Sequence, residues 1–236
     1  MKIKWSALVS DVRGKLNGSV ASKNRYGSYF RNKVTPTNPQ TASQMRVRGI
    51  FGAISKLWGG LTNAQRRAWE VFANQHQFTD IFGDAQTLQG NAMFQKVNMN
   101  LHKIGATLIS SPGEVIETPY IADSIAGMNV VDGVITTAGV DVEFGEIPNA
   151  DSVIVVYATP AISAGRKFTK NEMRFIGAYP VDTTQNATSL DFLDDYKAVH
   201  GDLIDENQHI DIKVATVSKS TGLQSPVFPV SVDINF

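Results

Sequence analysis

Three kinds of local structure follow one another in the segment Lys23-Asn24-Arg25-Tyr26-Gly27-Ser28-Tyr29-Phe30-Arg31-Asn32-Lys33-Val34-Thr35-Pro36-Thr37-Asn38-Pro39-Gln40-Thr41. Tyr29, Arg31 and Lys33 occupy alternate positions, which is the period-two pattern of a strand with one basic, aromatic face. The two prolines then break regular structure and hold the residues before them in extended geometry. Thr41 opens a helix-capping sequence. The segment therefore predicts a strand, a stiff linker and a helix start.

The residues before this segment extend the strand region to the N-terminus. Gly14, Gly18 and Gly27 punctuate an extended pattern that runs from Met1 to about Val34. A hairpin turn is expected near Arg25-Tyr26-Gly27-Ser28. We therefore expect residues 1–40 to form a basic β-arm or hairpin followed by a proline-rich linker.

Residues 41–112 have the pattern of three helices joined by short loops. The first begins at the capping box Thr41-Ala42-Ser43-Gln44 and ends at Gly59-Gly60. The second begins at Thr62-Asn63-Ala64-Gln65 and reaches about Gln75, and the third runs from about Gln89 to His102. The apolar residues at helical spacing are Val47, Ile50, Phe51, Ile54, Leu57, Trp58, Trp69, Phe72, Met93, Phe94, Val97, Leu101 and Ile104. This pattern favours a small three-helix bundle.

Residues 113–236 change to short runs rich in β-branched and aromatic residues. These runs are Val140–Phe144, Val153–Ala158, Arg174–Tyr179, Ser189–Phe192, Ile210–Val217 and Val227–Ile234. Turn sequences such as Val131-Asp132-Gly133 and Lys219-Ser220-Thr221-Gly222 separate them. Roughly seven strands over about 115 residues predict an antiparallel β-sandwich of the immunoglobulin or fibronectin type III kind. The expected fold class is therefore α+β.

The chain is formally neutral, with 22 Lys or Arg and 22 Asp or Glu, but its two halves carry opposite charge. Residues 1–110 contain 15 basic and 4 acidic residues, a net charge of +11, whereas residues 111–236 contain 7 and 18, a net charge of −11. Such a split is typical of a basic surface for a polyanion or an acidic partner, joined to a module of opposite charge. The candidate interface residues are Lys23, Arg25, Tyr26, Tyr29, Arg31, Lys33, Arg46 and Arg48.

Two kinds of partner fit this basic, aromatic segment. Its cations would neutralise phosphates while its aromatic rings stack on bases, or both would contact another protein. The segment has no ribonucleoprotein motif, zinc finger or helix-turn-helix signature. A protein partner is therefore favoured, with DNA as the alternative. The plain structural interpretation is a solvated strand face.

No motif for catalysis, cofactor binding or metal binding stands out. The chain has no cysteine, which excludes thiolate ligands and nucleophiles. His76, His102, His200 and His209 are scattered without metal-ligand spacing. The acidic pairs near residues 194 and 205 predict a solvated loop, because they lack the oxygen-ligand pattern of a calcium loop. We expect no enzymatic activity, no cofactor, no metal, no secretory signal and no membrane partner.

Several segments together resemble a widespread group of tailed-bacteriophage proteins, mostly without assigned function, as in crAss-like phages of Bacteroidetes. The segment 27–41 with Gln44 and Arg48 matches the family pattern R-x-x-V-x-P-x-N-P-x-T-x-x-Q. Leu61-Thr62-Asn63-Ala64-Gln65-Arg66-Arg67-Ala68-Trp69 matches its L-T-x-x-Q-R-x-A-W helix. Residues 84–91 are similar to its G-x-x-x-T-L-x-G entry to the third helix, and residues 221–226 to its last sandwich turn.

This resemblance implies a non-enzymatic structural protein of the virion, present in many copies and assembled in the bacterial host cytoplasm. The expected position is a head–tail connector, neck or tail ring. The expected partners are other copies of the chain and portal, neck or tail proteins, contacted through the N-terminal arm. A DNA-contacting virion protein, a capsid decoration protein and a carbohydrate-binding adhesion module are the alternatives. The family has no catalytic residues to transfer.

Overall fold

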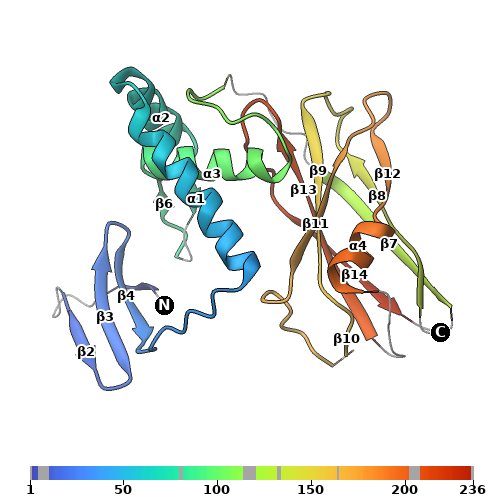
Figure 1. Cartoon of the computed structure of the whole chain (residues 1–236), viewed down its shortest axis with the longest axis horizontal. Coiled ribbons are helices and arrows are strands. Elements are labelled where there is room, and N and C mark those ends of the chain that lie inside the picture. Colours follow the sequence, from blue (N-terminus) through green and yellow to red (C-terminus); the bar gives the residue numbers. More distant parts are fainter. Residues whose placement is uncertain are drawn as a thin grey trace. The chain divides into compact units, whose positions relative to one another are not determined.

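The chain has an α+β fold in which helices and antiparallel sheets occupy different segments (Figure 1). The computed structural model describes residues 2–4, 11–79, 82–113, 121–131, 134–163, 165–201 and 208–234, and four helices lie within these ranges. The chain divides into two compact units, Met1–Met93 and Phe94–Phe236. Asp132 and Gly133 of the expected turn lie outside the described ranges, as do the acidic residues Asp202, Asp205 and Glu206. The finer division into 1–40, 41–112 and 113–236 stays a prediction.

The first unit begins with a four-stranded antiparallel sheet in the order β1-β4-β3-β2. Its strands are β1 (Lys2–Ile3), β2 (Gly14–Leu16), β3 (Ser19–Asn24) and β4 (Gly27–Asn32). Strands β3 and β4 form a hairpin in which Asn24 pairs with Gly27, and Arg25 and Tyr26 make the turn. Gly27 has φ +109°, a conformation that a side chain disfavours. The hairpin expected from the sequence is thus present.

Two helices follow the proline-rich linker, and both begin after the threonine expected to cap them, with the complete capping box present at the second. Helix α1 (Ala42–Gly60) begins after Thr41, whose side chain accepts a hydrogen bond from the Gln44 N–H at 3.3 Å. Helix α2 (Asn63–Gln75) begins with a complete capping box between Thr62 and Gln65. Such caps satisfy N–H groups that have no partner within the helix.

Arg66 joins the end of α1 to the start of α2. Its guanidinium Nη2 donates to the carbonyl oxygens of Gly59 at 2.9 Å and Trp58 at 3.3 Å, and the guanidinium lies over the Trp58 ring. A cation at a helix C-terminus satisfies carbonyl groups that lack a helical partner and opposes the negative end of the helix dipole. The tight connection between α1 and α2 therefore depends on Arg66.

Packing within the first unit is concentrated on α2 and the start of α3 (Gly90–Lys103). Trp69, Phe72, Ala73 and Met93 are buried. Gly90 lies so close to α2 that a Cβ there would be 2.9 Å from the backbone nitrogen of Glu70. Two short strands, β5 (Phe78–Thr79) and β6 (Ala85–Gln86), connect α2 with α3.

Helix α1 departs from the expectation of a buried apolar stripe. Of its apolar residues at helical spacing only Ile54 is buried. Val47, Phe51 and Leu57 are 51%, 47% and 48% exposed. The amphipathic pattern is present, but the single chain leaves much of this face in solvent. No helix in the part of the chain that the structure describes is both long and apolar enough to cross a membrane.

The second unit contains two antiparallel sheets that enclose one hydrophobic core (Figure 1). The first sheet has the order β12-β8-β7 and consists of β7 (Ile121–Val131), β8 (Val134–Phe144) and β12 (Ala187–Asp191). The second sheet consists of β9 (Ser152–Ala158), β10 (Ile162–Ser163), β11 (Arg174–Pro180), β13 (Gln208–Ser218) and β14 (Phe228–Ile234). Strand β13 lies between β14 on one side and β9 with β10 on the other. Inward-facing residues of both sheets make the core, as in a β-sandwich.

Helix α4 (Leu193–His200) occupies the connection between β12 and β13, where the sequence predicted a solvated acidic loop. That prediction was wrong, because Asp194 and Asp195 lie in the first turn of this helix, where the dipole favours negative charge. Tyr196 is buried and its hydroxyl donates to the Thr159 carbonyl oxygen at 3.1 Å. His200 Nε2 donates to the Ala158 carbonyl oxygen, and burial lowers the pKa of the His200 ring.

The loop between β13 and β14 packs against the C-terminal half of α3. Asn100 Nδ2 donates to the Gly222 carbonyl oxygen at 3.0 Å. The Asp151 carboxylate accepts hydrogen bonds from the Ser218 and Ser220 hydroxyls and from the Ser220 N–H. Gly222 has φ +63°, and a Cβ there would lie 2.7 Å from the Val97 carbonyl oxygen. Only glycine fits at this contact.

We therefore expect Gly222→Ala to destabilise the protein more than Gly105→Ala. Gly105 also has positive φ, +72°, but a Cβ there would meet nothing within 4 Å. Gly105→Ala should cost about 1 kcal/mol of backbone strain, and Gly222→Ala should cost roughly 1–3 kcal/mol more for the steric overlap. Urea denaturation measures both variants. Equal losses of unfolding free energy would contradict the close contact with α3.

Candidate functional site

Cross-strand register gathers basic residues on one face of the N-terminal sheet. Residues opposite each other in a sheet point to the same side, and neighbours along a strand point to opposite sides. Arg31 lies opposite Val20, which lies opposite Lys15, and Tyr29 lies opposite Lys2 in the next row. One surface of the sheet therefore contains Arg31 and Lys15 in one row and Tyr29 and Lys2 in the next.

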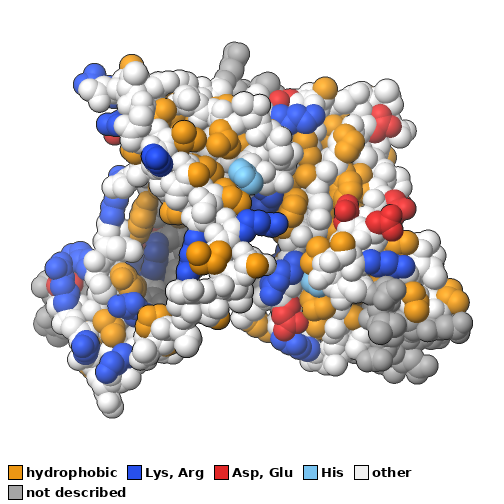
Figure 2. All heavy atoms as spheres, viewed as in Figure 1, with side chains coloured by type: hydrophobic (Ala, Val, Ile, Leu, Met, Phe, Trp, Pro, Cys, Tyr) orange, Lys and Arg blue, Asp and Glu red, His pale blue; other side chains and the backbone are white. Residues whose placement is uncertain are grey.

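Lys33 extends this surface beyond the end of β4. It follows Arg31 by two residues, and its N–H donates to the Gly18 carbonyl oxygen at 2.8 Å, which continues the strand pairing. The basic face is defined here as Lys2, Lys15, Tyr29, Arg31 and Lys33. The side chains of Lys15, Arg31 and Lys33 are exposed. Figure 2 shows Lys and Arg side chains gathered over the N-terminal sheet, and both acidic and basic side chains over the sandwich.

Other predicted interface residues lie elsewhere in the first unit. Lys23 lies opposite Ser28, so it belongs to the other side of the sheet, together with the buried Ala21. Arg46 is exposed on α1. Arg48 Nη1 donates to the Asn38 side chain at 2.7 Å and so ties α1 to the proline-rich linker. The eight candidates therefore do not form one continuous stripe.

Arg25 and Tyr26 turn toward the helical part of the same unit. The Tyr26 N–H donates to the Asn24 side chain at 2.9 Å, and the Tyr26 ring packs on Phe78 with centroids 6.4 Å apart. Arg25 lines a pocket of about 360 Å³. The contact of Tyr26 with Phe78 therefore anchors the hairpin to the rest of the unit.

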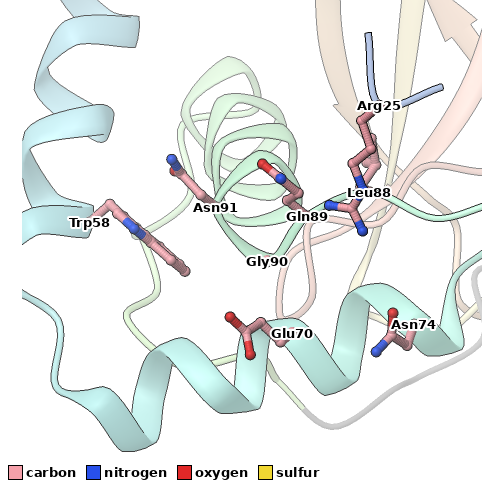
Figure 3. Close-up of a pocket in the computed structure, with 8 residues that line it drawn as sticks. All are labelled: Arg25, Trp58, Glu70, Asn74, Leu88, Gln89, Gly90 and Asn91. Carbon is pink, nitrogen blue, oxygen red and sulfur yellow. The ribbon is translucent and has the colours of Figure 1, made fainter. Parts of the chain in front are cut away.

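The pocket beside Arg25 is formed by the end of α1, the face of α2 and the start of α3 (Figure 3). In Figure 3, Trp58 points in from α1 and Glu70 from α2, and the Arg25 guanidinium lies near Gln89. Asn74 and Asn91 add amide groups to the lining. Small-molecule sites are lined mainly by apolar groups with a few polar ones. This lining is mostly polar, so the pocket does not have the composition typical of such a site.

Sequence reasoning did not identify the exposed apolar residues of the first unit as interface candidates. Leu16 and Val34 are 58% and 74% exposed beside the basic residues, and Val47 and Phe51 are exposed on α1. A helical apolar pattern predicts burial but does not say whether the covering surface belongs to the same chain. The apolar pattern of α1 could have indicated an interface, and the structure shows that Val47 and Phe51 are the residues left exposed.

Among the described residues, no group of three or more His, Asp or Glu side chains is placed to hold a metal ion. His76 Nδ1 donates to the Phe72 carbonyl oxygen at 2.8 Å, a contact within one helical turn. His209 is buried in β13.

Comparisons with protein-family models, with curated proteins and with solved structures found no match to this chain.

The exposed cations of the basic face should contribute little to folding. Lys15→Ser and Arg31→Ser should each change the free energy of unfolding by less than about 0.5 kcal/mol, because exposed side chains without specific contacts rarely matter. Ala21→Asp is the control, since Ala21 is 3% exposed in the same sheet and its replacement buries a charge. Thermal denaturation compares the three variants. A large loss in Lys15→Ser or Arg31→Ser would show that the basic face has a structural role.

Proposed function

We propose that this chain is a non-enzymatic structural protein of a bacteriophage virion, present in many copies and assembling through its N-terminal unit. A head–tail connector, neck or tail ring is the proposed position, with other copies and portal, neck or tail proteins as partners. The sequence resemblance to tailed-phage proteins supports the virion assignment. The distribution of apolar side chains supports assembly.

The observation that carries the proposal is the poor burial of the first unit. Among its described residues, nine large apolar side chains are exposed and seven apolar residues are buried. Among the described residues of the second unit, 6 large apolar side chains are exposed and 25 apolar residues are buried. Soluble monomers rarely keep large apolar surfaces in water, and extended apolar patches are typical of protein interfaces. We infer that other subunits cover the exposed apolar side chains of the first unit.

Helix α1 is the strongest case within this unit. Val47 and Phe51 are one helical turn apart, so they lie on the same side of α1, and both are about half exposed. The basic residues Arg46 and Arg48 lie beside them in sequence. An apolar strip bordered by cations suits a partner with an apolar centre and an acidic rim. We propose that a neighbouring subunit covers this strip, and that α1, α2 and α3 then act as a small three-helix bundle.

We further propose that the sandwich is of the fibronectin type III kind. Two antiparallel sheets around one core, with the chain crossing from one sheet to the other between β8 and β9 and again between β12 and β13, support this proposal. The absence of cysteine from the sequence disfavours the antibody type, which has a disulfide between its sheets. Domains of this architecture serve as spacers and as binding modules, so the fold alone assigns no activity.

The double substitution Val47→Ser with Phe51→Ser should weaken assembly without unfolding the chain, because both side chains are exposed in the single subunit. Sedimentation velocity should show discrete oligomers of the natural chain and a shift toward monomer in the variant. Val199→Ser is the matched control, since Val199 is 45% exposed on α4 in the second unit. A natural chain that stays monomeric over the whole concentration range, or a variant that assembles normally, would contradict the proposal.

DNA contact is the second candidate, and the basic face is the observation that favours it. Lys15, Arg31 and Lys33 are exposed on one surface, and Tyr29 precedes Arg31 by two residues on the same side of β4. If this face binds DNA, log affinity should fall linearly with log salt, and Lys15→Ser with Arg31→Ser should reduce the slope by about 2. Fluorescence anisotropy with labelled duplex DNA measures this. No binding at low salt would remove the candidate.

A further inference from the structure

The sheet β12-β8-β7 has an outer face that the sandwich core does not use. Register places its outward residues in rows across three strands. Glu143 lies between Asp123 and Ala187, Asp141 lies between Ile125 and Ser189, and Gly139 lies between Gly127 and Asp191. The acidic face is defined here as Asp123, Ile125, Gly127, Gly139, Asp141, Glu143 and Asp191.

Negative charge on this face is not balanced by the strands that form it. None of the three strands contains Lys or Arg. Asp141 and Glu143 are exposed, and within the described ranges no cation pairs with either carboxylate. Asp123 and Glu143 lie directly opposite each other, an arrangement of like charges that destabilises a sheet. The Asp123 carboxylate accepts a hydrogen bond from the Ser124 N–H at 2.8 Å, so Asp141 and Glu143 are the carboxylates best placed for a contact outside the sheet.

The centre of the acidic face is a shallow hollow made by two glycines. Gly127 and Gly139 lie opposite each other and have no side chains to fill the surface between their neighbours. The hollow has a volume of about 470 Å³ and is lined also by Ile125, Asn129 and Asp191. Ile125 is 69% exposed at its edge. The hollow thus has glycine backbone at its centre, one exposed apolar side chain at its edge and carboxylates around it, and a polar rim is typical of a protein-binding surface.

We propose that the acidic face of one subunit binds the basic face of a second copy of this chain. This inference rests on the multi-copy assembly proposed above and names the two surfaces that meet. Lys15 and Arg31 of one copy pair with Asp141 and Glu143 of the other, and the ring of Tyr29 covers the hollow over Gly127 and Gly139. Aromatic side chains placed over glycines in this way stabilise sheets.

The dimensions of the two faces are compatible. Lys15 and Arg31 lie on strands separated by one strand, so their backbones are about 10 Å apart. Asp141 and Glu143 are alternate residues of β8, about 7 Å apart. Long Lys and Arg side chains bridge a difference of this size. Opposite potentials on the two faces also orient the approach of one copy to another.

Charge balance favours a second copy over DNA as the occupant. Every subunit carries one basic and one acidic face, and its 22 basic and 22 acidic residues cancel. Pairing of the two faces brings the opposite charges of neutral subunits together and needs no other counter-charge. A DNA partner would occupy only the basic face and would be repelled by the acidic one.

Charge reversal on each face provides the test. The full-length variants Lys15→Glu with Arg31→Glu, and Asp141→Lys with Glu143→Lys, should each weaken self-assembly about tenfold or more, because each brings like charges together. An equimolar mixture of the two variants should assemble again, since every contact between unlike variants then joins opposite charges. Sedimentation velocity at low and high salt measures all three samples.

The outcomes separate the two proposals. Arg67→Glu with Glu146→Lys is the control, because both residues are exposed and lie outside the two faces. If the natural chain does not assemble, the proposed function fails. If it assembles but the reversal variants assemble equally well, or if the mixture stays dissociated, the pairing of these two faces is overturned while the proposed function stands.

Gly127→Val tests the hollow without changing charge. A Cβ at Gly127 would meet nothing within 4 Å, and its φ is not in the positive range, so the valine fits the strand. We expect an unchanged melting temperature and an assembly about tenfold weaker, because the valine fills the space assigned to Tyr29. Assembly as strong as that of the natural chain would exclude Tyr29 from the hollow.

Discussion

Strand register decides which side chains of this protein reach solvent, because neighbouring residues of a strand point to opposite sides of its sheet. In the sandwich, register sends Val140 and Val142 to the core and Asp141 and Glu143 to the outer face. In the N-terminal sheet it separates Arg31 from Phe30 in the same way. A slip of one residue in either sheet would exchange apolar and charged faces. The positions of the charged side chains are therefore fixed by the same pairing that fixes the fold.

The sandwich and the N-terminal sheet differ in how much of their apolar side is covered. The sandwich covers its apolar side with a second sheet, so only the polar side remains available. In the N-terminal sheet only Ala21 and Ser28 are buried among the residues of its strands. Three or more strands need an apolar face packed on something to be independently stable. The anchoring contacts of Tyr26 on Phe78 and of Lys4 with Asp84 supply part of this support.

Local signals in the sequence predicted the helix boundaries well. Thr41 and Thr62 cap α1 and α2 as expected, and α1 ends at Gly60. These features depend on neighbouring residues alone, so a single sequence contains them. Helix α4 was missed for the converse reason. Its N-cap residue, Phe192, makes no side-chain capping bond, and the helix is held instead by the buried Tyr196.

Strand β7 and the side of the N-terminal sheet on which each basic residue lies were harder to predict. The outer positions of β7 include Asp123 and Gly127, which are poor strand formers, so the segment has little β-propensity of its own. Ten paired positions along β8 compensate for this. The basic stripe was predicted from spacing, and register confirms the alternation of Tyr29 and Arg31 while placing Lys23 on the other side. The side of the sheet that each of these residues occupies depends on how separate strands pair, and the spacing of residues within one strand does not reveal that pairing.

Charge and apolar surface have different roles in an assembly of this kind. Charged pairs at the edge of an interface contribute mainly to the rate and specificity of association, whereas buried apolar groups contribute most of the affinity. Val47 and Phe51 on α1 are exposed apolar side chains, whereas the lining of the hollow over Gly127 combines Ile125 with Asn129 and Asp191. Because the basic and acidic faces are different surfaces of one chain, contact between them is heterologous. Such a contact closes into a ring only when the rotation between neighbours divides a full turn, and otherwise builds an open filament. The stiffness of the linker that contains Pro36 and Pro39 would then influence closure, because a flexible linker tolerates many rotations and a stiff one selects few.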